Sequence, residues 1–138
     1  KQIIEKKLNL GQNQKLFFSS IVYDSKIYSN QETKLLSSLI NKNFTLVTGI
    51  ANSKPLVNHL RALNFKFQHL EFPDHHHFSN NELNLISSEK IILTTEKDFS
   101  RLNLVEHESL FYIPIKTKIH LQEKFENEIR IFLENFSF

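Results

Sequence analysis

The most constraining feature of this sequence is a regular alternation of short apolar stretches and helix-like segments between residues 44 and 115. The apolar stretches are rich in β-branched and aromatic residues, which favours strands at 44–50, 65–72, 90–94 and 110–115. Strands that alternate with helices over short connections form a parallel sheet, because each connecting helix packs back onto that sheet. We therefore expect an α/β three-layer sandwich, a mostly parallel sheet flanked by helices, similar to half of a Rossmann fold.

Helix start signals support this reading. The segment Asn52-Ser53-Lys54-Pro55 offers an N-cap followed by a proline in the first turn, and it predicts a helix to about Leu63. Ser79 or Asn80 can cap a helix over residues 80–87, with Glu82 near its positive end. We expect a short helix from residue 96 to 102 and an amphipathic helix over 121–136.

The first 43 residues are less regular. Residues 1–10 have apolar side chains at helical spacing before Gly11, residues 16–23 read as a strand or short hairpin, and residues 31–43 read as a helix. We expect residues 1–43 to be a connector helix and a strand or hairpin segment, and residues 44–138 to be the α/β domain.

Composition excludes several classes of protein. The net charge is +2, from 17 basic and 15 acidic residues spread along the chain, and this distribution provides no basic stripe for nucleic acid. Cysteine is absent, and no apolar run reaches the roughly 18 residues of a membrane-spanning helix, so we expect a cytoplasmic protein. The chain lacks methionine and begins at Lys1, which leads us to expect a piece of a longer polypeptide.

Three polar segments should meet at the carboxyl edge of the sheet. They follow the first three predicted strands and comprise residues 49–52, 74–76 and 94–98. If strand 44–50 lies between strands 65–72 and 90–94, the chain order reverses there and a crevice opens at this edge. Ligand sites of open α/β sheets lie at such positions.

The segment Asp74-His75-His76-His77 concentrates groups suited to chemistry. Imidazole transfers protons near neutral pH, and an adjacent carboxylate can fix its tautomer. A solvated loop or an adventitious metal site would explain the same composition. We do not expect a structural zinc site, since no cysteine is present and adjacent histidines on an extended loop do not readily converge on one tetrahedral ion.

The other two segments allow a structural or a functional reading. Gly49 either forms a plain strand-to-helix turn or lets the backbone approach an anion. Thr95 can cap the helix that Glu96 begins, and Asp98 suits the same helix end. Lys97 suits that end poorly, so we expect it to point at a phosphate or at Asp74.

The motifs FPDHHHFS, TTEKDFSRL and VTGIANSKPL, at this spacing, resemble the carboxyl-terminal domain of the tetraacyldisaccharide 4'-kinases, the lipid A kinases of Gram-negative bacteria, in a form like that of the Bacteroidetes. The likeness is clearest over residues 44–114, and FFSSIVYD resembles an element near the inter-domain connection. It implies an amino-terminal P-loop domain as partner, ATP and Mg²⁺ bound mainly by that domain, and a tetraacyldisaccharide 1-phosphate substrate. It also implies peripheral contact with the cytoplasmic face of the inner membrane.

The resemblance implies that Asp74 and His75 face the nucleotide cleft, with His75 assisting an aspartate of the other domain. His76 is the second choice, and His77 occupies a variable position of the pattern. Cleft-shaping roles fall to Gly49, Asn52, Glu96, Lys97 and Asp98. No GxxxxGK[ST] motif occurs in the sequence, so we expect the chain alone to be inactive.

Two other classes remain open at this point. A non-catalytic interaction or metal-binding module would fold equally well. A DHH-type phosphoesterase would bind manganese through aspartates that precede the triplet, but only Asp24 is available and it lacks a DxD context.

Overall fold

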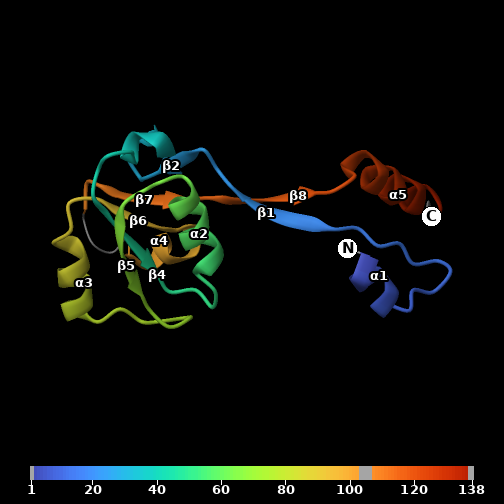
Figure 1. Ribbon diagram of the computed structural model, residues 1–138, viewed down its shortest axis with the longest axis horizontal. Helices are drawn as coiled ribbons and strands as arrows, with labels where there is room; N and C mark the ends of the chain where they lie inside the picture. The colour runs from blue at the N-terminus through green and yellow to red at the C-terminus, as the bar shows by residue number, and fades with distance from the viewer. Residues whose placement is uncertain (1, 103–106, 137–138) are drawn as a thin grey trace. The chain divides into compact units, whose positions relative to one another are not determined.

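The computed structural model describes residues 2–102 and 107–136 (Figure 1). The chain divides into two compact units, residues 23–116 and a smaller unit made of residues 1–22 and 117–138. The larger unit therefore includes part of the segment that we expected to be a connector. A functional division at residues 43 and 44 stays a prediction.

The larger unit is built on a six-stranded sheet of order β3-β2-β7-β6-β4-β5. Strands β4 (Phe44–Thr48), β5 (Phe67–Glu71), β6 (Ile92–Thr95) and β7 (Leu110–Ile113) run parallel to one another. Strand β2 (Lys26–Tyr28) is antiparallel to β7, and β3 (Thr33–Leu35) is antiparallel to β2. The predicted α/β class is confirmed, and β4 lies between β5 and β6 as expected.

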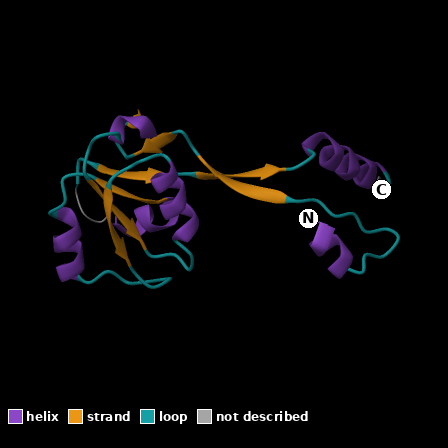
Figure 2. Ribbon diagram, viewed as in Figure 1, coloured by secondary structure: helices purple, strands orange, loops and turns teal. Residues whose placement is uncertain are grey.

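Helices cover both faces of this sheet (Figure 2). Leu46 packs in one core cluster with side chains of α2 (Lys54–Ala62), whereas its neighbour Val47 packs in a second cluster with side chains of α3 (Asn80–Ser87) and α4 (Glu96–Leu102). Successive side chains of a strand point to opposite faces of the sheet, so the two clusters are its two sides. The arrangement is the expected three-layer sandwich.

Local sequence accounts for the helix starts. Pro55 lies in the first turn of α2, and Leu56, Val57 and Leu60 are buried, whereas Leu63, the C-cap residue, is 46% exposed. Helix α3 begins with a complete capping box, in which the Ser79 side chain accepts from the Glu82 amide and Glu82 accepts from the Ser79 amide. Both helices begin where predicted, but Ser53 at the N-cap of α2 makes no side-chain capping hydrogen bond, so the predicted cap is confirmed for α3 alone.

The helix predicted over residues 31–43 is wrong. The structure has β3 there, followed by the 3-10 helix η1 (Leu36–Leu39), which buries Leu36 and Leu39. Three residue pairs between β2 and β3 organise this segment. Leu36 and Leu39 are three residues apart, so a single helical turn is enough to bury both. The rest of the segment can therefore pair with β2, and this pairing overrides the local helical spacing.

The strand predicted over residues 110–115 is interrupted. It ends at Ile113, and β8 (Ile115–Ile119) begins after Pro114. Proline has no amide hydrogen with which to continue a ladder, and here its carbonyl accepts from the Asp24 amide at 3.0 Å.

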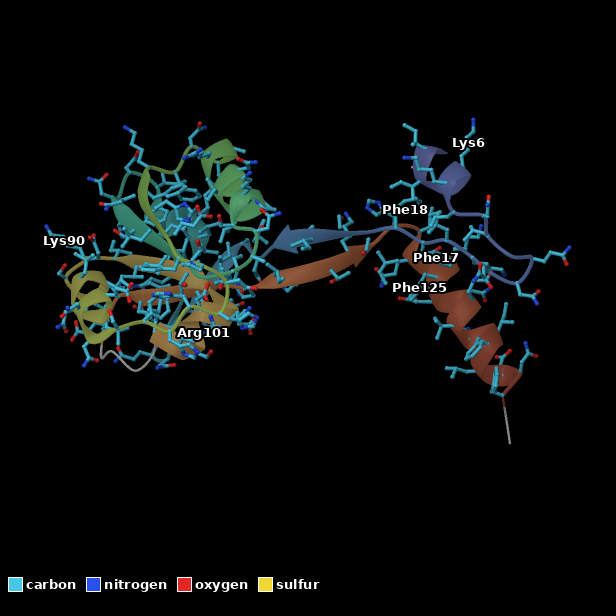
Figure 3. The ribbon with its side chains drawn as sticks, turned by 90° about the horizontal axis from the view of Figure 1, so that it is seen from below. Lys6, Phe17, Phe18, Lys90, Arg101 and Phe125 are labelled. Carbon is cyan, nitrogen blue, oxygen red and sulfur yellow. The ribbon has the colours of Figure 1, made fainter. Side chains whose placement is uncertain are left out.

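The smaller unit contains α1 (Gln2–Lys7), β1 (Ser19–Tyr23) and α5 (Gln122–Glu134), and β1 pairs with β8. Phe17 packs edge-to-face against Phe125 of α5, with ring centroids 5.2 Å apart (Figure 3). Helix α5 confirms the predicted C-terminal helix, and α1 is shorter than predicted. None of the helices in residues 2–102 and 107–136 is long and apolar enough to span a membrane.

Candidate functional site at the carboxyl edge of the sheet

The carboxyl ends of β4, β5 and β6 meet at one edge because these strands are parallel neighbours. Val47 pairs with Leu70 on one side and with Thr94 on the other, so the strands end at nearly the same level. The segments that follow them are the three polar segments of the sequence. Their predicted arrival at one edge is confirmed by the strand order.

Asp98 ties the ends of β4 and β6 together. Its side chain is fully buried, and its Oδ2 atom accepts from the Gly49 amide at 2.8 Å and from the Thr95 hydroxyl at 2.7 Å. The Thr95 hydroxyl also accepts from the Asp98 amide at 3.1 Å, which is the predicted cap of α4. Asp98 therefore holds the frame of the site and does not line its surface.

Gly49 is required by close packing. A Cβ atom built at this position would lie 3.1 Å from Oδ1 of Asp98 and 3.6 Å from the Pro73 carbonyl oxygen. Since the Gly49 amide already donates to Asp98, it is not aimed at a ligand anion. Of the two readings of this glycine, the geometry favours the structural turn.

Lys97 is directed at Asp74. Its Nζ atom lies 2.8 Å from Oδ1 of Asp74, which links the start of α4 to the loop that follows β5. The Lys97 hydrogen bond, with a smaller contribution from His75, holds the pKa of the Asp74 carboxyl below its usual value. Asp74 therefore carries a negative charge next to the first histidine at neutral pH.

His75 is the most accessible group of the Asp74–His75 pair. Its side chain is 74% exposed, and its backbone has a positive φ of 59°, a conformation uncommon for a residue other than glycine. Its amide donates to Oδ1 of Asp74 at 3.0 Å. Its Nε2 atom lies 3.6 Å from Oδ2 of Asp74, which is ion-pair distance and too long for a hydrogen bond. The loop geometry thus presents this imidazole to solvent.

His76 has a different environment, although it is the next residue. Its ring stacks on Phe72 at 5.0 Å and meets the edge of Phe78 at 5.2 Å. Its Nε2 atom lies 3.1 Å from both carboxylate oxygens of Glu82. Hydrogen bonds from Ser79 and then from His76 hold the pKa of Glu82 at about 2. These contacts make His76 an anchor for the loop.

The remaining predicted residues are less involved. The Asn52 side chain is exposed and accepts from the Lys54 amide at 3.3 Å, within its own turn. Glu96 is exposed in the first turn of α4, and His77 is exposed in the loop. Among the described residues, none of these three is hydrogen-bonded or ion-paired to Asp74, His75 or Asp98.

Sequence reasoning missed Arg101, a residue of α4 that is labelled in Figure 3. Its Nη2 atom lies 3.4 Å from Nδ1 of His75, and its Nη1 atom lies 3.5 Å from Oδ1 of Asp98. The spacing in the sequence could have indicated this residue: Arg101 lies four residues after Lys97, so both share one face of the helix, and Lys97 is directed at Asp74. A second pair was also missed: the Thr48 hydroxyl lies 2.8 Å from Nε2 of His69.

The carboxylates of this edge do not fit a magnesium site on this chain. Asp98 is buried and bonded to Gly49 and Thr95, and Asp74 is bonded to Lys97. No group of three or more potential metal ligands is assembled within residues 2–102 and 107–136. The edge offers an exposed imidazole and a set of fixed charges.

Comparison with known proteins gives one consistent result. The sequence pattern of the family described as tetraacyldisaccharide-1-P 4'-kinase (LpxK) matches residues 2–134. A tetraacyldisaccharide 4'-kinase of Flavobacterium johnsoniae is 39% identical over 133 residues, which are 91% of this chain and 38% of that protein. The namesake from Bacteroides thetaiotaomicron is 35% identical over 155 residues, 92% of this chain and 40% of that protein.

Among solved structures, an apo form of LpxK from Aquifex aeolicus in complex with ATP has a TM-score of 0.58 to this chain at 20% identity. The match covers 91% of this chain and 39% of that one, and it concerns the fold. The chain thus spans less than half the length of the relatives it matches. By its sequence, it belongs to the tetraacyldisaccharide-1-P 4'-kinase family.

Proposed function

We propose that this chain is the carboxyl-terminal domain of an ATP-dependent lipid kinase, which phosphorylates the 4'-hydroxyl of tetraacyldisaccharide 1-phosphate in lipid A biosynthesis. Family membership and the names of the relatives support the reaction. The observation that carries the role of this domain is the exposed imidazole of His75, held at the carboxyl edge of the sheet beside the ionised Asp74.

In the proposed reaction, the 4'-hydroxyl gives its proton to an aspartate of the amino-terminal domain and its oxygen forms a bond to the γ-phosphorus of ATP. The bond from that phosphorus to the β,γ-bridging oxygen breaks, and ADP leaves. Such transfers depend mainly on positioning and on charge stabilisation. His75 assists an aspartate of the amino-terminal domain, and Asp74 supports the imidazole. Lys97 and Asp98 act indirectly, since they fix the loop and the strand ends that carry this pair.

The amino-terminal P-loop domain is the proposed partner, and it would bind most of the ATP and the Mg²⁺. At the carboxyl edge of the sheet, the Gly49 amide is bonded to Asp98 and the Asp74 carboxylate is bonded to Lys97, so neither is available to these groups. In this proposal, residues 1–43 lead from the P-loop domain into the α/β domain. Exposed apolar side chains on the smaller unit, among them Ile3, Phe132 and Leu133, support contact with further protein.

The enzyme would act at the cytoplasmic face of the inner membrane, as a peripheral protein, because its substrate is a lipid. The test is an assay of the full-length parent protein with γ-labelled ATP, Mg²⁺ and tetraacyldisaccharide 1-phosphate, with this 138-residue chain assayed in parallel. Label should appear at the 4'-position only with the full-length protein. An inactive, folded full-length protein, or transfer by the short chain alone, would overturn the proposal.

A further inference from the structure

We propose that Arg101 is a positioning residue for His75, which selects the neutral imidazole tautomer with Nδ1 as acceptor and the proton on Nε2. The proposal rests on the proposed function, in which His75 assists phosphoryl transfer. It adds a residue from α4 that the three polar segments do not contain.

On one side, Arg101 faces the buried carboxylate of Asp98, which is itself held by two hydrogen bonds. Oδ2 of Asp98 is bonded to the Gly49 amide and the Thr95 hydroxyl, so Oδ1 has a fixed direction. Oδ1 of Asp98 and Nη1 of Arg101 are both buried, lack hydrogen-bond partners and lie 3.5 Å apart. The opposite charges of these two atoms compensate each other in a site that excludes water.

On its other side, the same guanidinium meets the imidazole. Nη2 lies 3.4 Å from Nδ1 of His75, at the long end of the hydrogen-bond range. The Arg101 side chain is 27% exposed and the His75 side chain is 74% exposed, so the contact joins the interior to the surface. The planar guanidinium can serve Asp98 and His75 together because its two terminal nitrogens point in different directions.

The chemistry of arginine decides the tautomer. A guanidinium has only donors and keeps its proton, so the imidazole nitrogen next to it must present a lone pair. A neutral imidazole then carries its hydrogen on Nε2, the nitrogen that faces Oδ2 of Asp74 at 3.6 Å. Arg101 and Asp74 thus favour the same tautomer from opposite sides of the ring.

This arrangement makes His75 a hydrogen-bond donor through Nε2. The 3.6 Å separation from Asp74 leaves that N–H without a short protein acceptor in its own loop, so it can turn to an incoming carboxylate. The proposed contribution of His75 is therefore to orient and stabilise a carboxylate of the amino-terminal domain. Loss of Arg101 would let the ring adopt the other tautomer, in which Nε2 is an acceptor.

The first test needs no kinase activity. Long-range ¹H–¹⁵N spectra of the labelled chain, recorded at a pH where imidazoles are neutral, report which ring nitrogen carries the proton. The His75 signals are identified by their loss in His75→Ala. We expect Nδ1 to be unprotonated in the wild type, and the Nδ1-protonated form to appear in Arg101→Met.

Arg101→Lys and Lys97→Met serve as matched variants. Lysine at position 101 keeps a charged donor and should preserve the wild-type tautomer at least in part. Lys97→Met removes the bond to Asp74 but leaves the Arg101 contact, so Nδ1 should remain unprotonated. Thermal melts check folding, and the Nδ1 state of the wild type keeps the inference testable if Arg101→Met is unfolded. A protonated Nδ1 in the wild type, or an Nδ1 that stays unprotonated in folded Arg101→Met, would overturn the inference.

The second test uses the full-length kinase. Arg101→Met should lower kcat on the order of tenfold, the effect of losing about one hydrogen bond to a charged group, with KM for ATP unchanged. Arg101→Lys should recover part of this loss. An unaffected kcat would overturn the positioning role of Arg101 in the reaction. If His75→Ala itself keeps full turnover, the proposed role of His75 in the reaction fails, and the spectra still report separately on the contact with Arg101.

Discussion

The loop that follows β5 has two halves, Asp74-His75 and His76-Phe78, whose surroundings differ although both contain histidine. Asp74 and His75 are held by charged contacts to α4, and the imidazole faces solvent. His76 and Phe78 are packed with Phe72, next to the capping box of α3. The His75 imidazole can face solvent in a defined place because the packed ring of His76 anchors the backbone next to it. The side-chain contacts of each half can be removed separately by mutation.

The largest expected effect is on catalysis by the exposed half. In the full-length kinase, His75→Ala should lower turnover by roughly 10²- to 10⁴-fold, the scale for a participant in acid-base chemistry. The fold should remain intact, because the side chain is 74% exposed. Steady-state kinetics with thermal melts measure both quantities.

His77→Ala is the matched control for this variant, since His77 is an exposed histidine of the same loop. It should have a much smaller effect on turnover. Asp74→Ala should fall between the two, because Asp74 orients its neighbour through the backbone and through charge. Equal turnover of the His75 and His77 variants would contradict the proposed role of His75 in catalysis.

The next largest effect concerns the frame beneath the exposed half. Gly49→Ala places a Cβ atom 3.1 Å from Oδ1 of the buried Asp98, which is fixed by two hydrogen bonds. We expect a loss of about 1–3 kcal/mol in the free energy of unfolding, the usual cost of overpacking. Urea denaturation measures it.

Gly11→Ala provides the control. The nearest atom to a Cβ at position 11 is Oε1 of the Gln14 side chain, at 3.7 Å, and this side chain is flexible. Its midpoint in urea should match that of the wild type. Equal midpoints for both alanine variants would contradict the tight packing at Gly49.

The anchoring half should respond in stability. His76→Ala removes ring contacts with Phe72 and Phe78 and a partner of Glu82, and we expect a loss of about 1–2 kcal/mol in the free energy of unfolding. His77→Ala should leave it unchanged within about 0.5 kcal/mol. A His76 variant as stable as the His77 variant would show that the packed ring does not anchor the loop.

A smaller effect follows from the pKa of Glu82, which is about 2 in the folded chain against an ordinary value of 4.5. Because the folded pKa is lowered, the carboxylate stabilises the fold above pH 4.5, and this contribution is lost as the pH falls toward 2. Glu82→Gln should therefore reduce the dependence of stability on pH in that window. Glu96→Gln, at an exposed carboxylate, should not, and identical pH profiles for wild type and the Glu82 variant would contradict the linkage.

The smallest expected effect is that of metal removal. A chelator should leave the melting temperature of the chain unchanged, since His76 is committed to Glu82 and the phenylalanine rings, and Asp74 to Lys97. Calorimetry with and without chelator measures this. A sharp drop would favour the metal-binding module over the kinase domain and would remove the distinction between the two halves of the loop.

Local sequence was sufficient wherever an element is defined by its own residues. Strand β4 is a fully buried run of aromatic, apolar and β-branched residues, and the start of α3 is marked by Ser79 and Glu82. The alternation of strands and helices implied a parallel sheet, and hence the meeting of three polar segments at one edge. The segment 31–43 does not form the predicted helix, because its two buried leucines suit either a helix or a single turn, and only pairing with β2 decides between them.

The sequence by itself determined the α/β class, the position of the polar loops and the family, because these depend on local periodicity and on motif spacing. Only the tertiary structure decided which side chains in those loops meet. Asp98 bonds to Gly49 across 49 residues, and Arg101 reaches His75 across 26. The positive φ of His75 likewise depends on the packing of the whole loop. Such contacts have no periodic signature, since they follow from where separate strands end and not from the residues adjacent in the chain.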